Sequence, residues 1–165
     1  MSKKVVLGIN YGSHDTSAAI LVDGELVAAC EEERYTGNKH TREFPINAIN
    51  DCLKLSNTTF SDISCVAFGY EPDILLKNES EAKKIRRELK SKEIYKNILK
   101  KNFNYEGRVD FHEHHLCHLA SAYYPSGFSK SLLMSNDGIG ETLCSMFGCG
   151  ENGKIKKLVE KNHFP

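Results

Sequence analysis

The 165-residue sequence predicts an α/β fold. Short apolar runs bounded by glycine, proline and asparagine or aspartate are typical of strands. Between some of these runs lie segments whose apolar residues recur at helical spacing. Strands therefore come first and then alternate with helices, an order typical of mixed α/β architectures.

Three strands open the chain and are expected to form an antiparallel meander. Val5–Asn10 is a short apolar run with a glycine inside it, and Asp23-Gly24 is a strong signal for a tight hairpin between the next two runs. A polar, charged loop over residues 33–43 follows the meander. The three expected strands are Val5–Asn10, Ser17–Val22 and Glu25–Glu32.

Helices and further strands alternate after this loop. Pro45 stands where a helix would begin, and Ile46, Ile49 and Cys52 follow at helical spacing. The order βββαβαβα is that of a ribonuclease-H-like unit. Its remaining expected elements are a strand at Ile63–Tyr70, a long charged helix over about 79–101, a strand at Arg108–His112 and a helix at His114–Tyr123.

A second β-meander begins near the end of the sequence. Its expected strands are Ser131–Ser135, Thr142–Cys149 and Lys154–Glu160, with a turn at Asp137–Gly140. We therefore predict a first subdomain over 1–128 and the start of a second over 129–165, a weak repeat of architecture. Without helices of its own, the second unit would leave one sheet face uncovered, so we expect a fragment or split subunit of a larger protein.

Composition and sequence pattern give no support for several classes of partner. Lys+Arg and Asp+Glu balance at 22 each, which gives no support for nucleic-acid or membrane-surface binding. The apolar runs are too short to span a bilayer, and no signal-peptide pattern is present. The six scattered cysteines form no CxxC pair and are interpreted as buried or free thiols of a reducing cytosol. We expect a cytoplasmic protein with neither a membrane nor a nucleic-acid partner.

Four histidines fall among the seven residues 112–118. On a helix, His114 and His118 lie one turn apart on one face, about 6 Å along the axis, whereas His115 points away from that face. Two imidazoles at this spacing can hold one metal ion if a carboxylate joins them, and Asp137 is the best local candidate. Histidines that merely cap or pack a helix start are the alternative.

Two expected turns contain glycine, one at Tyr11–Thr16 and one at Asp137–Gly140. They offer backbone N–H groups, hydroxyls and carboxylates that can surround phosphate oxygens. The same residue types are ordinary turn formers, so the pattern alone leaves both interpretations open. If the two meanders face each other, as in a duplicated fold, both turns point into one cleft. The candidate nucleotide-binding residues are Gly12, Ser13, Asp15, Thr16, Gly138 and Gly140.

Six sequence blocks, in order across nearly the whole chain, resemble the carbamoyltransferases of nodulation-factor and antibiotic biosynthesis. The resemblance implies the N-terminal part of an actin-like ATPase domain, similar also to the enzymes that put threonylcarbamoyl on tRNA. The 79–101 region is covered least. The blocks are Gly8–Ala19, Glu31–Arg34, Lys39–His40 with Phe44–Pro45, His114–His118 with Ala120–Ala122, Tyr124–Phe128, and Asp137–Glu141.

The resemblance also implies a reaction. Family members transfer a carbamoyl group from carbamoyl phosphate, with ATP and through a carbamoyl-adenylate, to a hydroxyl of a small molecule. It implies that His114, His118 and Asp137 hold a divalent metal, iron or else magnesium with the nucleotide. In this reaction His14 is the candidate general base, because imidazole titrates near working pH. Lys39 or His40 is the candidate for stabilising the developing oxyanion.

Two alternatives stay open at this point. One is a tRNA threonylcarbamoyl-transferase-like enzyme, and the other is a non-catalytic nucleotide- or metal-binding half that needs a partner chain. The resemblance places a further aspartate ligand in a C-terminal half that lies outside this sequence and would be supplied in cis or in trans. A homodimer is also open. We expect the 165-residue chain alone to be inactive.

Overall fold

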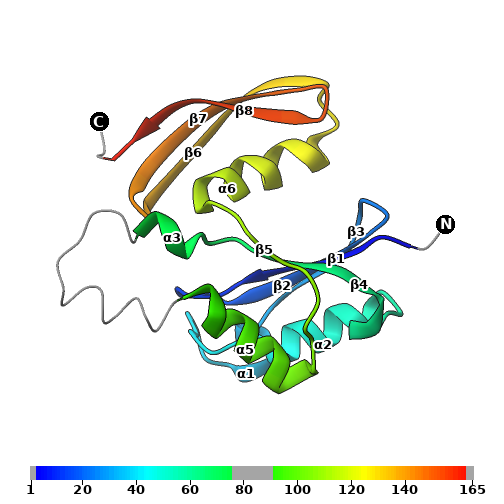
Figure 1. Ribbon diagram of the computed structural model, residues 1–165. Coiled ribbons are helices and arrows are strands. Elements are labelled where there is room, and N and C mark those ends of the chain that lie inside the picture. Colours follow the sequence, from blue (N-terminus) through cyan, green and yellow to red (C-terminus); the bar gives the residue numbers. More distant parts are fainter. Residues whose placement is uncertain (1–2, 76–90, 163–165) are drawn as a thin grey trace, which may run out of the picture.

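A computed structural model describes residues 3–75 and 91–162, and these residues form two β-sheets with helices packed around them (Figure 1). The first sheet has the strand order β3-β2-β1-β4-β5, and the second has the order β6-β7-β8. Strands β1 to β3 pair antiparallel, whereas β4 and β5 run parallel to β1. The predicted α/β class and the opening meander are confirmed.

The observed elements agree with most of the expected ones to within a few residues. The strands are β1 Val5–Asn10, β2 Ser17–Val22, β3 Glu25–Glu31, β4 Ile63–Phe68, β5 Val109–Phe111, β6 Lys130–Gly140, β7 Leu143–Glu151 and β8 Lys154–Lys161. The helices are α1 Glu33–Thr36, α2 Ile46–Leu55, α3 Pro72–Leu75, α5 Lys92–Phe103 and α6 His114–Tyr123.

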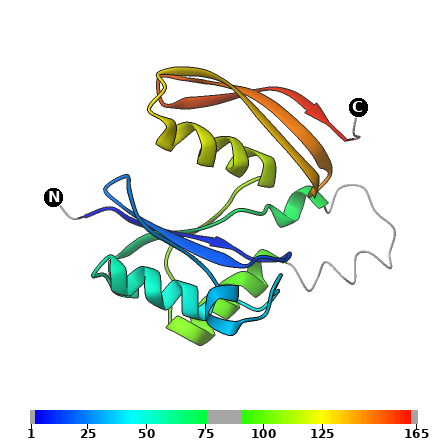
Figure 2. The same ribbon diagram turned by 180° about the vertical axis from the view of Figure 1, so that it is seen from behind.

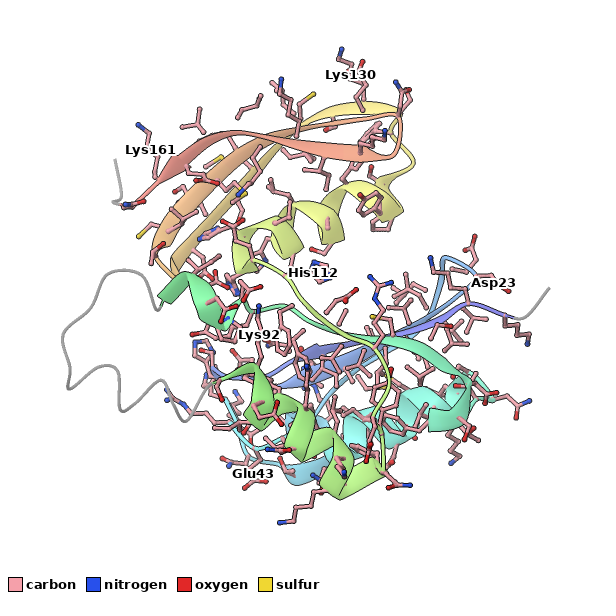
Figure 3. The ribbon with its side chains drawn as sticks, viewed as in Figure 1. Asp23, Glu43, Lys92, His112, Lys130 and Lys161 are labelled. Carbon is pink, nitrogen blue, oxygen red and sulfur yellow. The ribbon has the colours of Figure 1, made fainter. Side chains whose placement is uncertain are left out.

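The helices α1 and α5 differ from what the sequence predicts. The loop expected at 33–43 begins with the short helix α1, which the sequence pattern did not indicate. Residues 79–90 of the expected long helix lie outside the described residues, and α5 covers the rest. Figure 3 labels Lys92 at the start of α5. Its ammonium lies 2.8 Å from Glu71 and 2.6 Å from Asp73, so ion pairs tie α5 to α3.

Strand β1 shows how the first sheet separates its two faces. Val5, Leu7 and Ile9 are at most 3% exposed and belong to the core that α2 and α5 cover. The alternate side chains of a strand point to the opposite face. On that face Gly8 and Asn10 line a cavity toward α6, which lies between the two sheets in both views (Figures 1 and 2).

Helix α6 packs on the second sheet through a small core of its own. Leu119 and Tyr123 of the helix meet Leu133, Leu143 and Met146 of β6 and β7, all at most 8% exposed. The helix therefore belongs by its packing to the three-stranded sheet, although it precedes that sheet in sequence. The division into subdomains at residues 128 and 129 stays a prediction.

Among residues 3–75 and 91–162, no helix or strand covers the other face of the second sheet (Figures 1 and 2). Met134, Phe147 and Val159 are cross-strand neighbours on β6, β7 and β8, and they are 63%, 37% and 43% exposed. Apolar cross-strand neighbours normally pack under a covering layer. The sequence predicts an uncovered face of this kind for a second unit without helices of its own; that this unit is incomplete stays a prediction.

The prediction of a turn at Asp137–Gly140 is wrong. Strand β6 continues to Gly140, and the chain reverses at Glu141-Thr142 before β7. Between Asn136 and Gly140 the pairing register with β7 shifts. A bulge of this kind keeps a strand paired while it re-aims side chains. Glycine and aspartate here mark a bulge, and Asp137 lies within it.

Glu32 is a buried carboxylate that stabilises the start of α2. It is 2% exposed, and its Oε2 accepts a 2.8 Å hydrogen bond from the Ala48 N–H. Its Oε1 accepts bonds from the Asn47 side-chain and backbone nitrogens at 2.7 and 3.3 Å. Helix α2 has no side-chain cap from its own N-cap residue Pro45, so Glu32 supplies it from the end of β3.

Removing this carboxylate is expected to destabilise the fold. Glu32→Ala leaves the buried Ala48 N–H and the partly buried Asn47 N–H of α2 without this acceptor and should lower the free energy of unfolding by about 2 to 4 kcal/mol. Glu32→Gln keeps one acceptor and should cost less. Urea unfolding followed by circular dichroism measures both, with the exposed Glu25→Ala as control. Equal midpoints for Glu32→Ala and Glu25→Ala would contradict the capping role.

Candidate functional site

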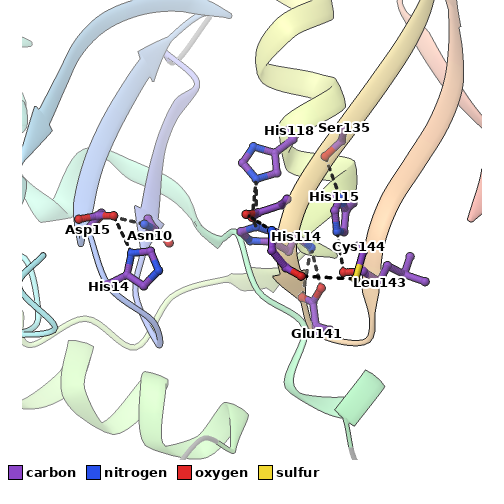
Figure 4. Close-up of polar contacts among 12 residues, drawn as sticks. Asn10, His14, Asp15, His114, His115, His118, Ser135, Glu141, Leu143 and Cys144 are labelled. Atoms are coloured by element: carbon purple, nitrogen blue, oxygen red, sulfur yellow. Dashed lines mark hydrogen bonds and ion pairs between the residues drawn. The ribbon is translucent and has the colours of Figure 1, made fainter. Parts of the chain in front are cut away.

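His114, His118 and Asp137 meet where α6 begins beside the bulge in β6. Figure 4 labels the two histidines. The His114 Nε2 atom lies 2.9 Å from His118 Nε2 and 2.8 Å from Asp137 Oδ2. The third side of the triangle, from His118 Nε2 to Asp137 Oδ2, is 3.5 Å. The structure thus brings together the three side chains that the sequence suggested. The two histidines lie one turn apart on α6, and Asp137 lies on β6.

These three residues fit a divalent cation. His114 Nε2 contacts both Asp137 Oδ2 and His118 Nε2. An imidazole nitrogen carries either one proton or one lone pair. If His114 Nε2 donates its proton to Asp137, it has no lone pair with which to accept a proton from His118. A cation among the three atoms removes this conflict. Two imidazoles and one carboxylate are also a common donor set for iron and zinc.

Electrostatics favours the ligand forms of these groups. Burial, and next the nearby His114, lower the pKa of His118, which keeps its imidazole neutral. The hydrogen bond from His114 lowers the pKa of Asp137, which keeps its carboxyl group ionised. A neutral imidazole and an ionised carboxylate are the states that bind metals.

Glycine at position 140 allows the His114 ring to lie where it does. A Cβ atom on Gly140 would collide with the imidazole of His114, whereas one on Gly138 would meet open space. The Gly138 N–H donates a 2.6 Å hydrogen bond to Asp137 Oδ1. The two glycines proposed for nucleotide binding therefore contact the metal candidates, and their role toward a nucleotide stays a prediction.

Glu141 fixes the backbone of His114, a role that sequence reasoning missed. Both carboxylate oxygens accept from the His114 N–H at 3.1 Å, and Oε1 also accepts from the Glu71 N–H at 2.9 Å. Burial raises the pKa of Glu141. An acidic side chain at a helix N-terminus is stabilising there, but Glu141 is 27 residues away in sequence, and local capping patterns do not detect that distance.

His115 anchors the same helix to the second sheet. It is fully buried; its Nε2–H donates to the Leu143 carbonyl at 2.9 Å, and its Nδ1 accepts from the Ser135 hydroxyl at 2.7 Å. The expectation that His115 points away from the metal face is confirmed. The neighbouring Cys117 is no ligand of the three-residue cluster, and burial raises the pKa of its thiol to about 11.

A second cluster joins the loop between β1 and β2 to the segment between α1 and α2. His14 Nδ1–H donates to Asp15 Oδ2 at 2.6 Å, and His40 Nδ1–H donates to Asp15 Oδ1 at 2.8 Å. These hydrogen bonds, first from His14 and then from His40, lower the pKa of Asp15. The Asn10 side-chain amide donates a 2.8 Å hydrogen bond to the Asp15 carbonyl (Figure 4). The sequence suggested His14, Asp15 and His40 separately and gave no sign of this contact.

The other predicted residues of this region lie around the cluster. Gly12 adopts a φ of 110° and packs against the Tyr95 hydroxyl. Thr16 is 1% exposed, and its hydroxyl has no hydrogen-bond partner among the described residues. Ser13 and Lys39 are exposed. Their roles toward phosphate or an oxyanion stay predictions.

A cavity of about 1110 Å³ separates the first sheet from α6. Gly8, Asn10 and Ala19 line it from the sheet, and Leu116 and Cys117 line it from the helix. Its walls are largely apolar, with Asn10 at the edge that carries the β1–β2 loop. A site of this kind is typical of small-molecule binding.

Comparison with known proteins identifies the family. The family described as Carbamoyltransferase N-terminus matches residues 5–163. The chain belongs to this carbamoyltransferase family. It is similar to the nodulation protein NolNO of Sinorhizobium fredii, 31% identical over 158 residues that cover 91% of this chain and 23% of NolNO. An uncharacterized protein of Synechocystis sp. is 30% identical over 181 residues, covering 97% of this chain and 29% of that protein.

This carbamoyltransferase chain thus spans less than a third of the length of either relative. Among solved structures it is similar to YeaZ from Pseudomonas aeruginosa, with a TM-score of 0.50 and 14% identity, over 94% of this chain and 64% of YeaZ. At this identity the likeness shows the fold alone, and the expected actin-like fold is confirmed. Within residues 3–75 and 91–162, no helix has the length and apolar character needed to cross a membrane.

The two glycines beside His114 provide a matched test of the metal candidate. Gly140→Ala should push the His114 ring away and weaken binding of Fe²⁺ or Co²⁺ about tenfold or more, as for other changes to groups that orient metal ligands. Gly138→Ala should have little effect, because its Cβ meets nothing. Anaerobic calorimetric titration of the full-length protein measures both. Equal affinities for the two variants would contradict a metal role for His114.

Proposed function

We propose that this chain is the N-terminal part of an O-carbamoyltransferase. The full protein would use carbamoyl phosphate and ATP, form a carbamoyl-adenylate, and transfer its carbamoyl group to a hydroxyl of a small-molecule acceptor. The observation that carries the proposal is the match to the carbamoyltransferase N-terminus over residues 5–163. The convergence of His114, His118 and Asp137 supports it, since metal ligands are suited to a phosphorylated donor.

His114, His118 and Asp137 would hold the divalent cation, iron or magnesium. When bound, such a cation supplies a Lewis acid for phosphate and carbonyl oxygens. The residues behind these ligands keep them in place. Gly140 leaves space for the His114 ring, and Glu141 holds the His114 backbone.

His14 would act as the general base. Asp15 accepts the Nδ1–H of His14, which leaves the Nε2 lone pair free to take the proton of the acceptor hydroxyl. The acceptor oxygen then bonds to the carbamoyl carbon, the bond from that carbon to the phosphate oxygen breaks, and AMP leaves. The carbonyl oxygen gains negative charge during this attack. The exposed Lys39 or His40 would stabilise that charge.

The first test of the function uses the full-length protein with carbamoyl phosphate, ATP and a panel of hydroxyl compounds. Mass spectrometry should detect AMP and a carbamoylated product, and Asp137→Asn should abolish product formation. The 165-residue chain alone should give none. Product formation by the isolated chain would contradict the interpretation of this chain as one part of the catalytic domain.

The second test isolates the proposed base. With preformed carbamoyl-adenylate supplied to the full-length protein, His14→Ala should slow transfer about 10²- to 10⁴-fold. His112→Ala is the matched control, because His112 is an exposed histidine beside the cavity and belongs to neither cluster. Equal rates for wild type and His14→Ala would refute the base assignment.

A third test addresses Asp15. In Asp15→Asn the carboxylate that accepts the Nδ1–H of His14 becomes an amide, which no longer fixes the His14 tautomer whose Nε2 accepts the proton. The rate of transfer from preformed carbamoyl-adenylate should therefore fall, by up to about 10⁴-fold. Stopped-flow or quenched assays measure this rate, and the double variant His14→Ala/Asp15→Asn should be no slower than His14→Ala alone. Unchanged transfer in Asp15→Asn, or additive losses in the double variant, would show that Asp15 does not act through His14.

A further inference from the structure

We propose that His14, Asp15 and His40 form a second divalent-cation site, distinct from the cluster of His114, His118 and Asp137. The bound ion is a cation that accepts mixed nitrogen and oxygen donors, such as Co²⁺ or Zn²⁺. A cation bound there would prevent His14 from accepting a proton. This last consequence rests on the proposed function, whereas the binding itself does not.

The donor atoms converge from two separate segments. One ligand atom from each of His14, Asp15 and His40 lies within 4.8 Å of the other two. The two rings are nearly perpendicular, at 86°, and their Nδ1 atoms approach different oxygens of the same carboxylate at 2.6 and 2.8 Å. Among residues 3–75 and 91–162, groups of three such donors converge only here and at His114, His118 and Asp137.

Hydrogen bonds on both sides hold these segments together. The Asn10 side chain donates to the Asp15 carbonyl at 2.8 Å, and Thr16 N–H donates to the Thr41 carbonyl at 3.4 Å. The His40 N–H donates to Glu33 Oε2 at 3.2 Å. The backbone that carries the three ligands is therefore fixed before any cation binds, which lowers the entropic cost of binding.

The site is accessible and contains one carboxylate. The side chains of His14, Asp15 and His40 are 57%, 46% and 75% exposed, so a cation can enter and keep water molecules as further ligands. Asp15 supplies the negative charge, and two imidazoles supply nitrogen donors. Each cluster offers three protein ligands, so the greater exposure of His14 and His40 predicts weaker binding than at the first cluster, where the histidines are more enclosed.

Cation binding and proton transfer exclude each other at His14. In the cation-free protein Nδ1–H faces Asp15, and Nε2 is the free acceptor. A cation on Nδ1 requires the single proton of the neutral imidazole to move to Nε2. Nε2–H is then a donor and takes no proton from a hydroxyl. Transfer should therefore rise with cation concentration as the first cluster fills and fall again as the second one fills.

Cobalt titration of the full-length protein at pH 7.5 tests the binding directly. Visible absorption and calorimetry should give one fewer bound Co²⁺ in His40→Ala than in wild type, and one fewer in His114→Ala. The double variant should lose both, and His112→Ala should lose neither. Asp15→Asn should repeat the loss seen in His40→Ala, which guards against a folding defect of a single variant. Binding at cysteine instead would give thiolate-to-cobalt bands in the near ultraviolet.

The outcomes separate this site from the proposed function. Unchanged Co²⁺ stoichiometry in both His40→Ala and Asp15→Asn, or a second ion bound by thiolates, overturns the second site and leaves the carbamoyltransferase proposal standing. If the site exists, the ratio of transfer rates at high and low Co²⁺ should rise to about one in His40→Ala, whatever its basal rate. A protein that binds both ions but transfers no carbamoyl group keeps the site and contradicts the function.

Discussion

The carboxylate of Glu141 joins the parts of the molecule that make the candidate metal centre. It accepts backbone N–H groups from Glu71, just beyond the first sheet, and from His114, the first residue of α6. Glu141 itself follows β6, which carries Asp137. One half-buried carboxylate thus fixes the strand exit, the helix start and the β6–β7 turn relative to each other. Without it, the segments that carry His114 and Asp137 would lose this restraint and keep the contacts of the buried His115 with Ser135 and Leu143.

The two histidine clusters share a composition but differ in their proton balance. At Asp15, two N–H groups meet two carboxylate oxygens, so every donor has an acceptor without a cation. At Asp137, one oxygen and two nitrogens crowd together with too few protons to satisfy all three contacts. The first arrangement suits an oriented base and binds a cation only when protons leave the two Nδ1 atoms, whereas the second suits a resident cation. The same residue types therefore support different chemistry because of geometry.

The sequence predicted the features that follow a short-range rule. His114 and His118 were recognised because helical periodicity places positions four apart on one face. The contact between Asp15 and His40 spans 25 residues, and the cap from Glu32 to Ala48 spans 16; no periodicity signals either. The turn expected at Asp137–Gly140 was wrong because glycine and aspartate mark bulges as well as turns. Local patterns thus located the ligands, whereas their supports required the fold.

The candidate metal centre is supported by buried residues on one side and is exposed to solvent on the other. Behind His114, the ring meets Gly140 and the backbone bonds to Glu141, while the buried His115 ties the helix to Ser135 and Leu143. In front, the His118 and Asp137 side chains are 48% and 42% exposed. A cation held by three protein atoms there keeps free positions that a phosphorylated donor or a further protein ligand can fill. Rigid support on one side and open coordination on the other is the arrangement that catalysis at a bound donor requires, because the ligands stay fixed while the donor comes and goes.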